Sequence, residues 1–104
     1  MPRFRFSQSA NADLADIVLY TRDTWGSVAA LNYLDALQEL AAQLAENPKL
    51  GKACTNLTEG LRGFQYQSHV VYYLEEKGGI VIARILHERM NAPLHFDANT
   101  DYEE

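Results

Sequence analysis

The sequence has a single cysteine, Cys54, among its 104 residues. One cysteine excludes an internal disulfide, and three dispersed histidines without a cysteine pair do not match the ligand spacing of a structural zinc site. We therefore expect neither a bound metal nor any other cofactor. The lone thiol also fits the reducing environment of the cytoplasm.

Long hydrophobic runs are absent as well. No uncharged apolar stretch approaches the ~20 residues that a membrane-spanning helix needs. The first residues, Met1 to Arg5, alternate polar and apolar side chains, whereas a secretion signal places a charged head before a hydrophobic segment. These features predict a cytoplasmic protein with no membrane partner.

The sequence has no excess of positive charge. Its formal net charge is −5, and residues 97–104 carry four acidic residues and no basic one. Residues 1–96 therefore hold ten acidic against nine basic residues, a net charge of −1. A protein that grips nucleic acid through its phosphates needs a broad positive field. We expect no direct sequence-specific nucleic-acid binding.

The remaining composition is that of an ordinary globular protein, with 47% hydrophobic and 22% charged residues. A mass of 11.8 kDa suffices for one compact domain and is too small for two separate cores. We assign residues 1–96 to this single domain. The acidic residues 97–104 are interpreted as a solvated C-terminal tail.

Two helices are predicted after an initial strand. Residues 3–6 alternate in polarity with the period of a strand. Ser7 or Ser9 can cap a helix that ends at Gly26, and a second helix follows until Asn47–Pro48, because the residue before a proline disfavours the helical conformation. Since only one or two residues join them, the two helices must form an antiparallel hairpin.

Three strand-like runs follow an irregular connector, at residues 61–66, 68–76 and 80–87. The resulting order, β-α-α-β-β-β, predicts an α+β fold in which the helical hairpin packs on one face of an antiparallel sheet. The last two runs are apolar on both faces, so the second face also needs a cover. The C-terminal tail, a second copy and a partner chain are the alternatives.

Short motifs along nearly the whole chain resemble the ParE toxins of the RelE/ParE superfamily of bacterial toxin–antitoxin systems. Their order and spacing, more than any single motif, carry the resemblance. One departure is Asn91, where such chains often have Asp. The motifs are residues 12–17, Tyr20-Thr21, Trp25-Gly26, Asn47-Pro48, Gly51-Lys52, Gly60-Leu61-Arg62, residues 68–73 and Ile85-Leu86-His87-Glu88-Arg89-Met90.

The resemblance implies the RelE/ParE-like fold, in agreement with the element order above. It also implies a type II toxin that inhibits DNA gyrase by binding it and so blocks replication. A cognate ParD-type antitoxin would neutralise the toxin in a hetero-oligomer, through an amphipathic helix laid over the helical hairpin or the exposed sheet.

RelE-type relatives on the same fold are ribosome-dependent mRNA endoribonucleases, so an enzymatic alternative stays open. That chemistry needs basic residues and an acid/base group around the scissile phosphate, and the candidates are Arg62, Arg84 and His87. Strand alternation sends Arg84 and His87 to opposite faces unless a bulge intervenes. Together with the nearly neutral body of the chain, this favours gyrase binding over RNA cleavage.

Each of these three residues also has a structural interpretation. Arg62 can be a rim arginine that pairs with Glu59 or with the acidic tail. Arg84 interrupts an apolar strand, so its guanidinium must meet an acidic group or reach solvent. His87 can fix the turn that leads into the tail.

The partner contacts are assigned within the same framework. We expect gyrase to contact the last strand and the tail, through Arg84, His87, Arg89, Met90 and Phe96. We expect the antitoxin to contact Trp25, Tyr33, Arg62 and Tyr73. For Trp25, at the end of the first helix, core packing is the favoured alternative.

Overall fold

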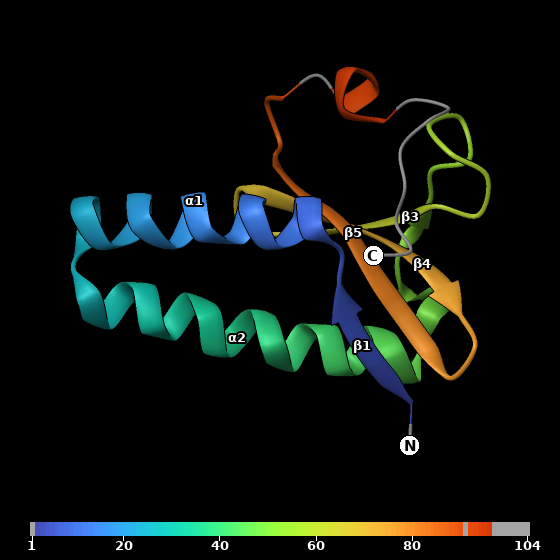
Figure 1. The fold of residues 1–104 in the computed structure, drawn as a ribbon, viewed down its shortest axis with the longest axis horizontal. Coiled ribbons are helices and arrows are strands. Elements are labelled where there is room, and N and C mark those ends of the chain that lie inside the picture. Colours follow the sequence, from blue (N-terminus) through green and yellow to red (C-terminus); the bar gives the residue numbers. More distant parts are fainter. Residues whose placement is uncertain (1, 91, 97–104) are drawn as a thin grey trace.

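The structure is a computed structural model that describes residues 2–90 and 92–96. Its two helices and its main strands follow the predicted order, and one short strand and two short 3-10 segments are added to it (Figure 1). The elements are β1 (Arg3–Phe6), α1 (Gln8–Trp25), α2 (Ser27–Glu46), η1 (Pro48–Leu50), β2 (Lys52–Ala53), β3 (Arg62–Tyr66), β4 (His69–Glu76), β5 (Gly79–His87) and η2 (Ala92–His95).

The five strands form one sheet in the order β1-β5-β4-β3-β2. Strands β3 to β5 pair antiparallel, as predicted, and the added β2 pairs antiparallel with β3. β1 runs parallel to β5 at the edge, so the sheet is mixed. Gly79 permits this pairing, because a Cβ atom there would lie 1.8 Å from the backbone oxygen of Arg3. A period-two pattern predicts that β1 is a strand but does not identify its neighbour.

The helical hairpin covers one face of the sheet (Figure 1). Gly26 joins the two helices with φ = 98°, a conformation that glycine adopts without steric cost. Side chains from α2 and from alternate positions of the strands fill the space between the layers. The fully or nearly buried members of this core include Ala10, Tyr33, Leu37, Leu40, Ala41, Leu44, Val71, Tyr73, Ile80, Ile82 and Ile85.

The opposite face of the sheet has its own cover. Phe96, at the end of η2, packs edge-to-face on Tyr72 with 5.1 Å between the ring centroids. Leu61 and Leu57 of the connector contribute to the same cluster. The chain thus covers part of this face itself, with Ala92 and Phe96 and with a connector whose contribution was not expected. The acidic tail, residues 97–104, lies outside the residues that the structure describes.

Tyr72 and Tyr73 belong to the two different clusters, so they point to opposite faces of the sheet. No helix in the described part of the chain is long and apolar enough to cross a membrane.

Candidate functional site

A groove lies between the helical hairpin and the turn that joins β3 to β4. Its volume is about 510 Å³. Ala29 and Ala36 stand about two helical turns apart on α2, and their small side chains leave the groove open. The residues that line it are Tyr20, Thr21, Trp25, Ala29, Asn32, Tyr33, Ala36, Tyr66, Gln67, Ser68 and His69.

The polar groups of this groove are neutral near pH 7. The hydroxyl of Tyr33 lies 3.4 Å from Nδ1 of His69. Burial, together with Tyr66, raises the pKa of Tyr33 to about 12. Burial is also the main cause that holds the pKa of His69 below 6.5, and nearby His87 lowers it further. The groove therefore presents an uncharged, largely aromatic surface, which suits apolar side chains of a partner better than phosphate groups.

Large apolar side chains stand exposed on the helical hairpin, and two of them, Tyr20 and Trp25, line the groove. The exposed fraction is 68% for Tyr20 and 73% for Trp25, and Val28 and Leu31 on α2 are exposed as well. The far end of the helical hairpin projects beyond the sheet, so no second layer covers it (Figure 1). The expectation that Trp25 packs into the core is therefore wrong. A cluster of exposed apolar side chains of this kind marks a protein interaction surface.

The turn at the edge of the groove contains a strained residue. Gln67 has φ = 54°, a left-handed conformation that few residues other than glycine adopt. Its backbone oxygen accepts a hydrogen bond of 2.9 Å from the side-chain amide of Gln65. Strained backbone of this kind clusters at functional sites, and its position here supports the groove as one.

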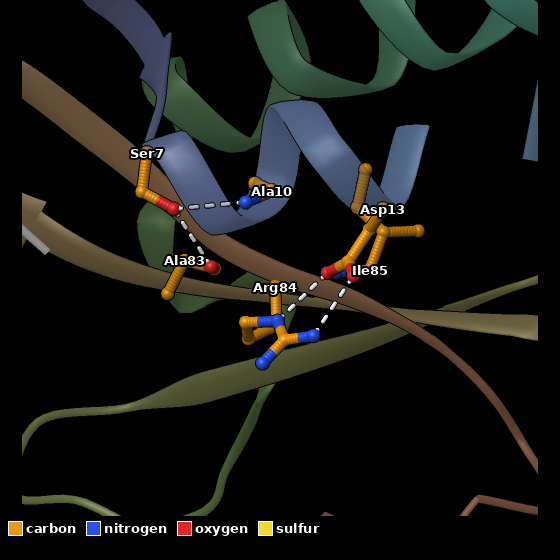
Figure 2. Close-up of polar contacts among 6 residues, drawn as sticks. All are labelled: Ser7, Ala10, Asp13, Ala83, Arg84 and Ile85. Atoms are coloured by element: carbon orange, nitrogen blue, oxygen red, sulfur yellow. Dashed lines mark hydrogen bonds and ion pairs between the residues drawn. The ribbon is translucent and has the colours of Figure 1, made fainter. Parts of the chain in front are cut away.

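Arg84 is held by a carboxylate on α1 (Figure 2). Its guanidinium donates two hydrogen bonds of 2.8 Å to the two oxygens of Asp13. Oδ2 of Asp13 also accepts the backbone N–H of Ile85 at 3.0 Å. The side chains of Arg84 and Asp13 are only 18% and 14% exposed. Of the two alternatives for Arg84, an acidic partner or solvent, the structure shows the acidic partner.

A second polar link joins the start of α1 to β5 (Figure 2). The register shift between Tyr72 and Tyr73 on β4 leaves Ala83 without a partner residue on that strand. The carbonyl of Ala83 instead accepts a hydrogen bond of 2.8 Å from the hydroxyl of Ser7. The same hydroxyl accepts the N–H of Ala10 at 3.1 Å and so caps the helix. Ser7 is buried, and its hydroxyl is hydrogen-bonded to both α1 and β5.

Arg62 and Tyr73 hold the connector. The guanidinium of Arg62 donates to the carbonyl of Gly51, so its observed partner is a backbone group and not the carboxylate of Glu59. The hydroxyl of Tyr73 donates to the carbonyl of Pro48 at 2.6 Å and accepts the N–H of Gly51 at 2.8 Å. Tyr73 is completely buried, so it is removed from the set of expected antitoxin contacts.

The residues expected to face gyrase differ in their exposure. Nδ1 of His87 accepts the backbone N–H of Arg89 at 3.1 Å, which confirms that His87 fixes the turn after β5. Arg89 and Met90 are exposed on this turn. Phe96 is only 6% exposed, because it covers Tyr72, so we interpret it as a packing residue.

The three candidates for phosphate chemistry occupy separate places. Arg62 lies on β3, two strands away from Arg84 on β5. His87 lies three residues further along β5, about 10 Å from Arg84 at the rise of a strand. The bulge precedes Arg84, so it does not bring Arg84 and His87 to one face. Each of the three side chains is engaged in a structural contact of its own.

The described ranges, 2–90 and 92–96, contain no group of three His, Cys, Asp or Glu side chains that could hold a metal ion. Cys54 is a half-buried free thiol beside the second hydrophobic cluster.

Tyr20 and the two alanines of α2 were not predicted from the sequence to line a functional site. Tyr20 belongs to the family motif but was not among the expected contacts. Ala29 and Ala36 look like ordinary helix formers in the sequence. The exposed apolar residues Val28 and Leu31 on α2 could have indicated an interaction surface on this helix, although neither lines the groove.

Comparison with known proteins agrees with this architecture. Residues 4–92 match the family model described as "ParE toxin of type II toxin-antitoxin system, parDE". The chain is 39% identical over 95 residues to Toxin ParE1 of Caulobacter vibrioides, which covers 91% of this chain and 98% of that protein. It is 37% identical over 90 residues to Toxin ParE1 of Mycobacterium tuberculosis, covering 86% of this chain and 92% of the relative.

A solved structure, "Chromosomal ParDE TA system from P. aeruginosa", superposes with a TM-score of 0.70, covering 84% of this chain and 96% of that one. Its sequence identity of 20% supports the fold alone. The family model spans most of the chain, and two relatives exceed 30% identity over nearly their whole length. The chain therefore belongs to the ParE toxin family of type II toxin–antitoxin systems.

Proposed function

We propose that this toxin acts by binding DNA gyrase in the bacterial cytoplasm and performs no bond-breaking chemistry of its own. The observation that carries the proposal is the separate engagement of Arg62, Arg84 and His87, each in its own structural contact. A ribonuclease must keep such groups together around one phosphate. A protein that inhibits by binding needs only an exposed surface, and the turn after β5 supplies one with Arg89 and Met90.

A gyrase supercoiling assay, run beside an in vitro translation assay with the same purified toxin, tests this proposal. We expect loss of supercoiling while the messenger RNA stays intact. Cut transcripts with normal supercoiling would overturn the proposal in favour of a ribosome-dependent endoribonuclease. If neither assay responds, the chain serves as an interaction module only, and the proposal fails as well.

The turn after β5 can be tested in the same assay. Arg89→Ala with Met90→Ala should weaken gyrase inhibition about tenfold or more, as expected for contact residues at the centre of an interface. Leu50→Ala is a matched control, because Leu50 is similarly exposed but lies on η1. Equal inhibition by both variants would remove this turn from the proposed gyrase surface.

We further propose that a ParD-type antitoxin occupies the groove between the hairpin and the β3–β4 turn. The groove is uncharged and rimmed by Tyr20 and Trp25, so it fits the apolar face of an amphipathic helix. Tyr33 stays in the proposed contact set because it lines this groove, although it is only 7% exposed. Arg62 and Tyr73 leave the set because they hold the connector.

Trp25→Ala should raise the dissociation constant of the antitoxin complex about 30-fold or more, since exposed aromatic anchors dominate such interfaces. The stability of the isolated toxin should change little, because most of the Trp25 side chain is already in water. Leu50→Ala again serves as the control for an exposed apolar residue elsewhere. Isothermal titration calorimetry with the cognate antitoxin measures the dissociation constant of each variant. Equal affinities of the Trp25→Ala and Leu50→Ala variants would contradict the proposal that the antitoxin occupies the groove.

A further inference from the structure

His69 lies at the edge of the groove that the antitoxin is proposed to occupy. It is the first residue of β4, it is half-buried, and it lines the groove with Tyr33 of α2. The other lining side chains are alcohols, amides, aromatic rings and methyl groups. Among the described residues of this lining, His69 is therefore the one whose charge can change between about pH 5 and 8.

The side of His69 that faces α2 supplies no negative charge. The rings of His69 and Tyr33 meet edge-on with 5.8 Å between their centroids, and Nδ1 of His69 lies 3.4 Å from the Tyr33 hydroxyl. Burial, together with Tyr66, raises the pKa of Tyr33 to about 12, so this hydroxyl keeps its proton. Tyr66 is also the partner of His69 on β3 and adds a second aromatic ring. A positive imidazolium at His69 thus finds no anion on this side.

His87 and Glu88 act on His69 from the end of β5. His87 is the cross-strand partner of His69, and the two imidazole rings meet edge-on with 5.5 Å between their centroids. Protons on both rings would bring two positive charges together. Glu88 acts in the opposite direction, but its carboxylate is exposed and accepts a hydrogen bond of 3.3 Å from the amide of Gln65. Burial, and then His87, outweigh Glu88 and keep the pKa of His69 below 6.5.

A partner that closes the groove removes more water from His69. Desolvation disfavours the charged imidazolium unless the partner brings an anion to it. An apolar segment brings none, whereas a carboxylate over the ring would stabilise the charged form. The exposed aromatic rings of Tyr20 and Trp25 on the groove favour an apolar segment. The direction in which pH changes the affinity therefore reports which kind of side chain covers His69.

We propose that the antitoxin covers His69 with an uncharged, apolar part of its helix, so that formation of the complex expels the proton from this imidazole. The antitoxin binds tightly to the toxin with neutral His69 and weakly to the toxin with protonated His69. Binding below about pH 6.5 therefore releases a proton to the solvent, and acidification weakens the complex. This proton release presupposes that the antitoxin occupies the groove, as proposed above.

Isothermal titration calorimetry of the full-length toxin with its cognate antitoxin tests the proposal. A series between about pH 5 and pH 7.5 spans the titration range of an imidazole. The dissociation constant should rise on the order of tenfold from the upper to the lower end, since one group changes it by at most about tenfold per pH unit. Titrations near pH 6 in two buffers with different ionisation enthalpies should count the release of a fraction of one proton, and near pH 7.5 the count should approach zero.

His69→Gln is the test variant, because glutamine keeps a polar side chain that does not titrate. The change of its dissociation constant with pH should shrink to the part contributed by other groups of the two proteins. His87→Gln is the matched control, since it removes the neighbouring imidazole and leaves His69 in the groove. It should retain the proton release at a slightly higher pH, because one cause of the lowered pKa of His69 is gone.

Nuclear magnetic resonance of the unaltered proteins gives a second measurement that needs no variant. The imidazole resonances of His69 should titrate in the free toxin and stay unchanged in the complex down to about pH 5. Circular dichroism at each pH verifies that the toxin and its variants are folded. A His69 imidazole that titrates equally in the free and bound toxin would contradict the proposal.

The calorimetric series has two further outcomes that would overturn the proposal. A dissociation constant that stays constant with pH would show that His69 keeps its proton equilibrium in the complex. A dissociation constant that falls on acidification would place a carboxylate of the antitoxin over His69.

Trp25→Ala near neutral pH separates this result from the occupation of the groove. If Trp25→Ala binds the antitoxin as tightly as the unaltered toxin does, the antitoxin does not occupy the groove and both proposals fail. If Trp25→Ala weakens binding while His69→Gln keeps the full pH dependence, the antitoxin occupies the groove and the proton release from His69 alone is refuted.

Discussion

Asp13 in α1 and Arg84 in β5 are 71 residues apart in the sequence, and their side chains are joined by two hydrogen bonds of 2.8 Å. The same carboxylate accepts the backbone N–H of Ile85. One acidic side chain therefore ties the first helix to the last strand. It also neutralises a guanidinium that phosphate chemistry would need to keep available.

Asp13→Ala should lower the free energy of unfolding by about 2–4 kcal/mol, because it removes the carboxylate that accepts from a poorly exposed guanidinium and from a backbone N–H. Urea unfolding followed by circular dichroism measures the change. Asp16→Ala, on the same helix but exposed, should stay within about 0.5 kcal/mol of the unaltered protein. Equal losses in the two variants would show that the ion pair does not stabilise the fold.

Tyr73→Phe should lower the free energy of unfolding by about 1–3 kcal/mol, since it removes the hydroxyl that pairs with the carbonyl of Pro48 and the N–H of Gly51. This destabilisation should be greatest in the connector that Tyr73 holds. Hydrogen exchange at Gly51 should accelerate more than exchange in β4 and β5. Tyr20→Phe removes a hydroxyl from an exposed ring and is the control. Unchanged exchange at Gly51 would argue against a role for Tyr73 in holding the connector.

Gly79→Ala should lower the free energy of unfolding more than Gly78→Ala does. A methyl group at Gly79 collides with the backbone oxygen of Arg3, so β1 must move away, at a cost of at least ~3 kcal/mol. At Gly78, where φ is 84°, a methyl group meets open space and adds only backbone strain of about 1–2 kcal/mol. Thermal unfolding of both variants, with hydrogen exchange of the β1 amides, compares them. A reversed order would contradict the close approach of β1 and β5.

Acidification should destabilise the protein through His69. Burial, and then His87, hold the pKa of His69 below its ordinary value of 6.5, so the folded protein binds this proton less tightly than the unfolded chain does. The contribution of neutral His69 is fully present above pH 6.5 and is lost as the pH falls through the pKa of the folded state. His69→Gln should flatten the dependence of the unfolding free energy on pH below 6.5.

Titration of His69 also separates the two causes of its lowered pKa, burial and the neighbouring His87. Nuclear magnetic resonance of the His69 imidazole should report a pKa below 6.5 that moves part of the way back in His87→Gln, because the burial of His69 remains. A pKa of His69 at or above 6.5 in the unaltered protein would refute both expectations.

Much of the fold could be predicted from the sequence because local signals mark its boundaries. Both helices begin and end at the expected caps, and β3, β4 and β5 lie within a residue or two of the predicted runs. The parallel pairing of β1 with β5 could not be predicted, because strand periodicity defines faces and not neighbours. The decisive residue, Gly79, looks like part of a turn until the backbone of Arg3 is placed beside it.

The candidate site was less predictable, because its chemistry depends on distant partners. Arg84 had to meet an acidic group or reach solvent, but nothing local identified Asp13. One interpretation paired Arg62 with a carboxylate, whereas its acceptor is a backbone carbonyl that no side-chain pattern reveals. Trp25 follows Leu14, Ile17 and Val18 at helical spacing, which favoured core packing. The end of this helix runs past the sheet, so the Trp25 side chain is left exposed to solvent.

The pairing of β1 with β5 has a consequence for synthesis. β1 is synthesised long before β5, the strand with which it pairs, so the sheet cannot close until residues 79–87 have been made. Until then the helical hairpin lacks both the Ala83 carbonyl and the Arg84 guanidinium that anchor it. The two helices therefore take up their final place on the sheet only after β5 has left the ribosome.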